Sequence, residues 1–172
     1  MRPVAKRLDY EDSCHRLKLV PAPPMPKQIP HCGDEEPLGV RFFRTLVEGD
    51  HSALTLPRTY FGRSEIKGAS FFNTNLRESN LCWNDFIEVD FGESDLRQSD
   101  LRASVFENVS FVRSNLQNAD LRRSSFINCR FHGASMKGAI LSKRQDKTLA
   151  LSVLQRVVIS WTDGDGDEPD GG

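Results

Sequence analysis

The sequence predicts an all-β solenoid, a closed four-sided coil of about four turns over residues 59–143. Two observations carry this prediction. A large apolar residue recurs at every fifth position, a spacing that neither an α-helix nor a β-strand produces. Pairs of Phe or Ile also alternate with pairs of Leu, so that the pattern recurs with every fourth unit and four units make one turn. A repeat this short cannot bury its own apolar face, so it must stack on copies of itself.

The central residue of each five-residue unit forms the predicted core. All 17 central positions hold Leu, Phe, Ile or Met, whereas the other 68 positions of the segment hold four such residues. Central residues four units apart should line one wall, and neighbouring turns should pair as parallel strands about 4.8 Å apart. The predicted structural core comprises Phe71, Leu76, Leu81, Phe86, Phe91, Leu96, Leu101, Phe106, Phe111, Leu116, Leu121, Phe126 and Phe131.

A second column lies two positions before each central residue and should also point inward. Every member of this column is small or Val except Asn84. A buried Asn without hydrogen-bond partners costs about 1 kcal/mol or more. We therefore expect a turn variant or a hydrogen bond to the backbone at Asn84.

The units SDLRQ, SDLRA, ADLRR, TNLRE, SNLCW and SNLQN resemble the A(D/N)LXX motif of the pentapeptide-repeat proteins. The resemblance covers residues 59–143, about half of the chain. It implies a right-handed quadrilateral β-helix in which the small residue and the Leu or Phe point inward. It also implies one possible role, because some members of the family bind DNA gyrase by imitating duplex DNA and confer fluoroquinolone resistance.

The segments outside the repeats divide by composition. Residues 1–37 are rich in proline and charge, which predicts a flexible N-terminal arm or wrap that is not part of the core, and the sequence leaves open whether this arm folds back on the rod. Residues 38–58 are apolar enough to form an N-terminal cap, which a stacked rod needs because its ends expose apolar groups and strand edges.

The repeat stops after Leu141, and residues 144–161 are predicted to form a C-terminal cap. The capping-box spacings Ser142 to Gln145 and Ser152 to Gln155 predict short helical turns, and residues 149–161 should supply apolar cover for the last turn. Residues 162–172 are acidic and glycine-rich, which predicts a disordered tail.

Composition narrows the functional classes. The net charge of −1 favours neither nucleic acid nor an anionic membrane as a partner, and no apolar run is long enough to span a bilayer. The N-terminal stretch MRPVAKRLDYEDSCHRLKLV carries charges where a signal peptide has an apolar core, so we expect a cytoplasmic, bacterial protein. In that compartment the four cysteines are expected to be reduced, and Cys82 should point outward.

The sequence predicts no enzyme, no catalytic residue and no cofactor. The repeated Ser and Asp residues are explained by the coil, where Asp95, Asp100 and Asp120 can bond the turn backbone. The pairs Cys14-His15 and His31-Cys32 could together supply two Cys and two His ligands. Adjacent residues rarely reach one zinc ion, so no metal site is predicted, although zinc remains an alternative.

Two outer surfaces are candidates for binding a partner. The basic ridge follows two neighbouring Leu-lined sides and comprises Arg77, Arg97, Arg102, Arg122, Arg123 and Lys137. It is either a solvated face neutralised by the adjacent Asp residues or a docking strip for an acidic partner. The opposite, Phe-lined sides carry the outward apolar residues Phe72, Trp83, Ile87, Val112 and Ile127, which form either a contact patch or a surface covered by the N-terminal arm.

These observations favour a non-enzymatic protein–protein interaction module. Its partner is a protein of unknown identity, and an immunity or inhibitor role that neutralises or shields this partner would fit. The alternative is a DNA mimic that binds DNA gyrase or topoisomerase. Residues 59–143 hold 11 Lys or Arg and 10 Asp or Glu, a balance that argues against mimicry. We expect neither direct nucleic-acid binding nor membrane binding. Self-association is compatible with the sequence but is not predicted by it.

Overall fold

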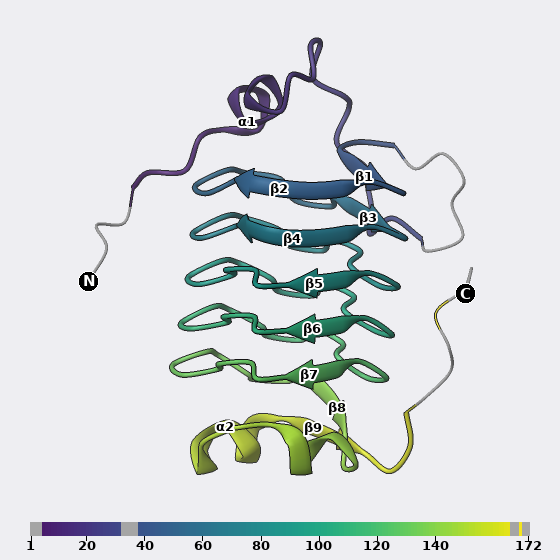
Figure 1. Ribbon diagram of the computed structural model, residues 1–172, viewed down its shortest axis with the longest axis vertical. Helices are drawn as coiled ribbons and strands as arrows, with labels where there is room; N and C mark the ends of the chain where they lie inside the picture. The colour runs from purple at the N-terminus through teal and green to yellow at the C-terminus, as the bar shows by residue number, and fades with distance from the viewer. Residues whose placement is uncertain (1–4, 32–37, 166–168, 170–172) are drawn as a thin grey trace.

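The chain winds into a rod of stacked coils with a helical segment at each end (Figure 1). The computed structural model describes residues 5–31, 38–165 and 169. Its elements are α1 (Tyr10–Arg16), β1 (Arg41–Phe43), β2 (Leu46–Asp50), β3 (Tyr60–Gly62), β4 (Glu65–Ser70), β5 (Asp85–Ile87), β6 (Val105–Glu107), β7 (Ser125–Ile127), β8 (Ile140–Ser142), the 3₁₀ helix η1 (Gln145–Thr148), α2 (Val153–Val158) and β9 (Ser160–Thr162).

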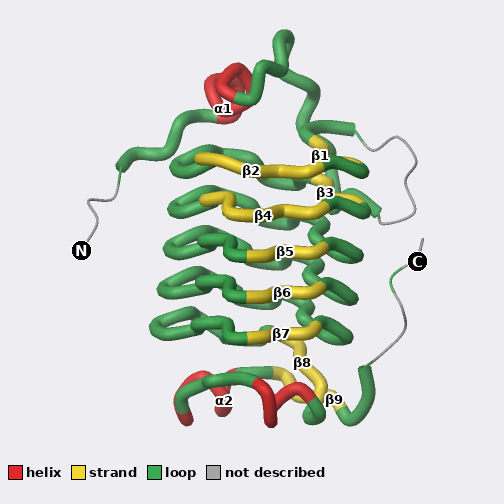
Figure 2. The backbone as a smooth tube through the Cα atoms, in the orientation of Figure 1, coloured by secondary structure: helices red, strands yellow, loops and turns green. Residues whose placement is uncertain are grey.

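One wall of the rod is a sheet of five parallel strands in the order β2-β4-β5-β6-β7 (Figure 2). Within the repeats its partners lie four units apart along the sequence, as in Phe86 opposite Phe106. Other walls are joined by single parallel bridges at the same spacing, such as Asp100 opposite Asp120. The predicted solenoid, its turn of four units and its parallel stacking are confirmed.

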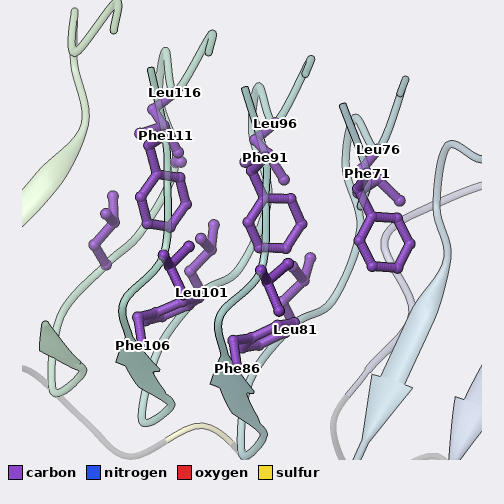
Figure 3. Packing of buried hydrophobic residues seen from close by; sticks show 14 of the residues in the cluster. Phe71, Leu76, Leu81, Phe86, Phe91, Leu96, Leu101, Phe106, Phe111 and Leu116 are labelled. Atoms are coloured by element: carbon purple, nitrogen blue, oxygen red, sulfur yellow. The ribbon is translucent and has the colours of Figure 1, made fainter. Parts of the chain in front are cut away.

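Aromatic stacks run through the interior of the rod. Each of the 13 predicted core side chains is at most 6% exposed. The ring of Phe106 stacks between Phe86 and Phe126, with centroid distances of 4.9 and 5.1 Å and interplanar angles of 5° and 6°. Phe91 and Phe111 continue a second stack on the next wall (Figure 3). Identical residues four units apart therefore pack directly on one another.

The corners of the coil all use the left-handed region of backbone space. The residue two positions after each central residue has a positive φ at every unit from Arg63 to Gly138. A residue branched at Cβ is strained there, and none of these 16 positions holds Val, Ile or Thr. Four of them hold Asn, which tolerates this conformation well.

The small-residue column links the coils through side-chain hydrogen bonds. The hydroxyl of Ser104 donates to the carbonyl of Leu81 (2.7 Å) and accepts from the backbone N–H of Asn84 (3.0 Å). Asn84 makes equivalent bonds one coil earlier. Its Nδ2 donates to the carbonyl of Phe61 (2.9 Å), and its Oδ1 accepts from the N–H of Ser64 (2.9 Å). The expected backbone hydrogen bonds at Asn84 are confirmed.

Residues 38–58 form a further coil, whereas the sequence predicted a separate cap. Strands β1 and β2 pair in parallel with β3 and β4. The inward positions of this coil include Phe42, whose ring stacks on Phe61 at 4.9 Å, and buried Val40, Val47, Leu54 and Leu56. The five-residue spacing from Phe42 to Val47 is lost after Val47, where the register shifts.

The cover at this end is α1, which lies within the arm that was predicted to stay outside the core. Cys14 is fully buried and belongs to the core cluster. The hydroxyl of Ser13 accepts from the N–H of Thr55 (2.8 Å), and the N–H of Leu8 donates to the carbonyl of Ala53 (2.8 Å). Apolar side chains and hydrogen bonds therefore hold the helix on the first coil.

The proline-rich stretch also contacts the rod. Asn80 Nδ2 donates to the carbonyl of Pro30 (2.8 Å), and Arg58 donates to the carbonyl of Pro26 (2.7 Å). Proline lacks an N–H but keeps its carbonyl, so side chains of the coil can bind this stretch. The remainder of the predicted arm, residues 1–4 and 32–37, lies outside the described residues.

Two glutamines close the C-terminal end of the rod in the same way. Gln145 Nε2 donates to the carbonyls of Leu121 (2.8 Å) and Ser124 (3.0 Å). Gln155 Nε2 donates to the carbonyls of Phe131 (2.6 Å) and Ala134 (3.1 Å). In both cases the side-chain oxygen accepts the N–H three positions earlier, which completes the capping box of α2. The short helical turns predicted here are present.

The expectations for the cysteines are only partly met. Cys14 and Cys129 are free thiols, whereas Cys82 is disulfide-bonded, which contradicts the predicted reduced state. Cys82 directly follows the inward Leu81 and is not part of the core cluster, although it is only 2% exposed. In the part of the chain that the structure describes, no helix is long and apolar enough to cross a membrane. Most of the predicted acidic tail, residues 162–172, falls outside the described residues.

Candidate interaction surfaces

The basic ridge is built from arginines that bind the turn aspartates. Arg97 forms a bidentate ion pair with Asp95, in which Nε donates to Oδ1 at 2.8 Å and Nη2 donates to Oδ2 at 2.6 Å. This hydrogen bond and the charge of Asp95 raise the pKa of Arg97. Arg102 and Arg122 contact Asp100 and Asp120 in the same geometry, at 2.7–3.0 Å.

Each of these aspartates also accepts a hydrogen bond from the backbone of its turn. Asp95 Oδ1 accepts the backbone N–H of Arg97 (3.2 Å), and the same bond recurs at Asp100 and Asp120. Arg102 lies 3.7 Å from Asp120 of the next coil, which joins two pairs into a ladder of alternating charge. The central ridge residues are therefore neutralised within the coil, as the solvated-face interpretation expects.

The ends of the ridge differ from its centre. Arg77 lies 3.9 Å from Glu78, and its buried Nε has no hydrogen-bond partner among the described residues. Arg123 and Lys137 are exposed.

The apolar residues on the Phe-lined sides are divided by other residues. Phe72 and Val112 are half-buried with Gly92 between them, and a Cβ at Gly92 would lie 3.1 Å from the Phe72 ring. This column lines a small groove of about 150 Å³ together with Arg113 and Arg130. The side chains therefore pack along the wall and present little continuous apolar surface.

The neighbouring apolar column is interrupted in the same way. Glu107 lies between Ile87 and Ile127 in the sheet register. Ile127 is 51% exposed, Ile87 is half-buried, and the indole Nε1 of Trp83 is buried without a hydrogen-bond partner among the described residues. The structure does not bring the five predicted residues together into one patch.

The polar side chains of α2 point toward the rod. Gln155 binds carbonyls of the preceding coil, as described above. Arg156 donates from Nε to Asp146 Oδ1 (2.8 Å), from Nη2 to the carbonyl of Leu149 (3.1 Å) and from Nη1 to the carbonyl of Leu151. The only charged side chain of this helix is thus neutralised and engaged by its own chain.

The apolar side chains of α2 point away from the rod, whereas the sequence predicted that this segment covers the last turn. Leu149, Leu151 and Ile159 beside the helix are buried and do supply cover. In the helix itself Val153, Leu154, Val157 and Val158 are 76, 80, 76 and 43% exposed. They are four of the eleven exposed large hydrophobic residues among those the structure describes. We call these four side chains the α2 apolar face.

The described residues contain no group of three or more His, Cys, Asp or Glu side chains placed to hold a metal ion. Of the zinc alternative, Cys14 is buried in the core and Cys32 lies outside the described residues. Burial raises the pKa of the Cys14 thiol and of the Cys129 thiol, which is the opposite of what activates a nucleophile.

Comparison with protein families agrees with the stacked coil. The family model described as pentapeptide repeats (8 copies) matches residues 64–102 and 104–142. This segment of the chain belongs to the pentapeptide-repeat family. The coil is accordingly a four-sided β-solenoid, with four five-residue units in each turn.

Solved structures of other pentapeptide-repeat proteins are similar to this chain. Rfr23 from the cyanobacterium Cyanothece 51142 shares 12% identity over 55% of this chain and 82% of its own, with a TM-score of 0.46. A protein of the Arabidopsis thaliana thylakoid lumen shares 26% identity over 66% of this chain and 65% of its own, with a TM-score of 0.23. QnrB1, a plasmid-mediated fluoroquinolone resistance protein, shares 14% identity over 68% of this chain and 69% of its own, with a TM-score of 0.29. A comparison with curated protein sequences finds no match.

The α2 apolar face is the surface that sequence reasoning on this pentapeptide-repeat protein missed. Its residues follow the spacing i, i+1, i+4, i+5, which places them on one side of a helix and leaves Gln155 and Arg156 on the other. This signal predicts an apolar face but not its direction. The apolar content of residues 149–161 was therefore interpreted as cover for the last turn.

Proposed function

We propose that this pentapeptide-repeat protein is a non-enzymatic protein-interaction module, in which the coil is a rigid support and the α2 apolar face is the contact surface. The observation that carries the proposal is the inverted orientation of α2. Its polar side chains, Gln155 and Arg156, form hydrogen bonds with other residues of the chain. The four aliphatic side chains of this short helix are exposed to solvent. Contiguous exposed apolar surface of this kind marks interaction sites.

The walls of the coil also fit the role of a support, with the contact surface at α2. Their arginines are held by turn aspartates, and ion pairs at such exposed sites contribute little to binding unless a partner displaces one side of the pair. An inhibitor or immunity role, in which the rod neutralises or shields a protein bound at its end, is the narrower form of the proposal. The DNA-mimic alternative has no comparable observation, since the repeats carry a nearly balanced charge.

The test uses the purified full chain as bait with two matched variants. Leu154→Glu places a charge in the α2 apolar face, and Leu46→Glu places the same charge at a 55% exposed site at the other end of the rod. Proteins retained from a lysate of the source cells are identified, purified and titrated against each bait. We expect a partner, either another protein or the chain itself, whose affinity falls at least tenfold with Leu154→Glu and is unchanged with Leu46→Glu.

Two outcomes would overturn this assignment. The first is that no protein, including a second copy of the chain, binds in a manner that depends on Leu154. The second is that a topoisomerase binds all three baits equally and is protected in a supercoiling assay, which would restore the DNA-mimic alternative.

A further inference from the structure

We infer that the α2 apolar face binds an acidic amphipathic helix of a partner protein, whose carboxylates contact the basic side chains around α2. This inference rests on the proposed function, because it takes the α2 apolar face as the contact surface and adds the chemistry of the partner. Five exposed cations near the helix form what we call the α2 basic rim: Arg130, Lys137, Lys143, Arg144 and Lys147.

The charge of the chain changes sign along the rod. Residues 59–120 hold 6 Lys or Arg and 10 Asp or Glu, whereas residues 121–161 hold 8 Lys or Arg and a single acid, Asp146. That acid is bound by Arg156, so it does not neutralise the rim. Although the net charge of the whole chain is near zero, its C-terminal end is therefore basic, and a local field of this sign attracts carboxylates.

Two lysines of the rim lie beside the helix. The N–H of Gly138 donates to the carbonyl of the last residue of α2 (2.9 Å), so Lys137 adjoins the end of the helix. Lys147 directly follows Asp146, whose carboxylate binds Arg156 of α2 (2.8 Å). Both lysines are exposed, and neither forms an ion pair with a residue that the structure describes. Their charges are available to a partner.

Arg130 lies at a groove beside the start of α2. The groove has a volume of about 390 Å³, and its lining includes Arg130, His132, Ser152 and Gln155. Arg130 and His132 are exposed there. A side chain of the partner that ends in a carboxylate can enter this groove and reach Arg130 while the partner remains on the α2 apolar face.

The chain's own acidic segment already places carboxylates on the rim. Lys143 Nζ lies 2.6 Å from Asp163 Oδ1, and Arg144 Nη1 lies 3.5 Å from Asp165 Oδ2. The two cations are 65 and 86% exposed, and ion pairs at such exposed sites are weak, so the carboxylates of a partner can replace them. Residues 162–172 contain no aliphatic residue, so this segment offers the α2 apolar face no apolar contact.

A helix is the element that fits the shape of the face. The four aliphatic side chains of Val153–Val158 form one short ridge at the end of the rod (Figures 1 and 2). Helices pack by placing such ridges into the grooves of a second helix at about 8–10 Å. Acidic residues on both sides of the partner's apolar stripe would then meet the rim, which gives the apolar centre and polar border that are typical of protein interfaces.

The test titrates the purified full chain against three fluorescent synthetic peptides of equal length. The first has leucines at the helical spacing i, i+3, i+4, i+7 with glutamates between them. The second has lysines in place of the glutamates, and the third has serines in place of the leucines. We expect the first peptide to bind at least tenfold more tightly than either of the others in fluorescence anisotropy, with an affinity that falls as salt is added.

Variants of the chain separate the rim from the apolar face. Lys147→Glu should weaken the acidic peptide at least fivefold, and Lys67→Glu, the same change at an exposed site of β4 toward the other end of the rod, should leave its affinity unchanged. The double variant Asp163→Asn with Asp165→Asn should bind the peptide more tightly, because its last segment no longer competes for the rim. Far-ultraviolet circular dichroism and the urea midpoint show whether each variant keeps the coil.

The inference is overturned if the wild-type chain does not bind the acidic peptide, or if Lys147→Glu binds it as tightly as the wild type does. Sedimentation of the chain alone, and with vesicles of anionic phospholipid, shows in that case whether a second copy or a lipid surface occupies the face instead. A natural partner whose affinity depends on Leu154 but not on Lys147 would leave the proposed function standing and refute the acidic helix. Peptide binding that Leu154→Glu does not weaken would refute the proposed function itself.

Discussion

Asn84 gives the sharpest test of how neighbouring coils are held together. It is 3% exposed and occupies a position where the next two coils have Ser104 and Ser124. Its amide binds the carbonyl of Phe61 and the N–H of Ser64. Asn84→Ala fits the column sterically, because Ala119 is buried at an equivalent small position.

The magnitude follows from the groups that lose their partner. Asn84→Ala removes the amide from the buried N–H of Ser64 and from the carbonyls of Phe61 and Cys82, and each such group costs about 1–3 kcal/mol. We expect the free energy of unfolding to fall by about 3 kcal/mol or more. Asn84→Ser should lose less than about 1 kcal/mol, because Ser104 makes the corresponding two bonds with its hydroxyl one coil later.

The assay is equilibrium urea unfolding, followed by circular dichroism, with the m-value compared between variants. A lower midpoint at an unchanged m-value reports a loss of stability. The reasoning is refuted if Asn84→Ala costs no more than an ordinary surface substitution, which changes stability by about 0.5 kcal/mol or less. It is refuted equally if Asn84→Ser is as destabilised as Asn84→Ala.

Three further predictions use the same unfolding assay. Phe106→Ala should lose about 3–5 kcal/mol, because it removes the middle ring of a stack, and Phe106→Leu should lose less than half of that; equal losses would contradict the packing argument. Burial lowers the pKa of His51 below its ordinary value of 6.5. As the pH falls, His51 is therefore protonated in the unfolded chain before it is protonated in the folded chain, and the free energy of unfolding should decrease between pH 7 and pH 5. His51→Gln should show a smaller fall over this range, and an unchanged fall would reject the assignment. Arg102→Ala should change stability by less than about 1 kcal/mol, since its ion pairs are partly exposed; a larger loss would mean that the ridge supports the coil.

The core of the rod could be predicted from sequence because each five-residue unit forms one wall. The inward direction is therefore set by counting, and burial of Phe71 or Leu96 follows without knowledge of the rest of the chain. The corners carried a second signal that was not used. The position two places after each central residue excludes branched side chains, because it requires the left-handed backbone region.

The ends of the rod could not be predicted in the same way, because they break the repeat. Residues 38–58 form a coil although their register with the next coil shifts between Val47 and Gly49. The sequence left open whether the proline-rich stretch folds back on the rod, and Asn80 and Arg58 hold it there by binding the carbonyls that proline retains. Composition describes the preferences of the isolated segment, whereas these contacts depend on what the neighbouring wall offers.

The orientation of α2 follows from what the last coil lacks. Along the rod, carbonyls in the small-residue column accept N–H groups from the following coil, as the carbonyl of Ser114 does from Ser135. At the C-terminal end no further full coil follows among the described residues, so the carbonyl of Ala134 has no N–H from a following coil and takes its hydrogen bond from Gln155. A side-chain amide can supply it and an aliphatic side chain cannot, so Gln155 faces inward.

Because Gln155 and Arg156 lie on one side of a short helix, turning them toward the rod necessarily turns the four aliphatic residues outward. The N-terminal end meets its requirement differently, since Leu8 and Ser13 supply a backbone N–H and a hydroxyl while Cys14 of the same segment enters the core. At the C-terminal end, the side chain that binds the last backbone carbonyls lies on a helix whose apolar side chains are thereby exposed to solvent. That asymmetry is the physical reason to expect the partner at α2 and not at α1.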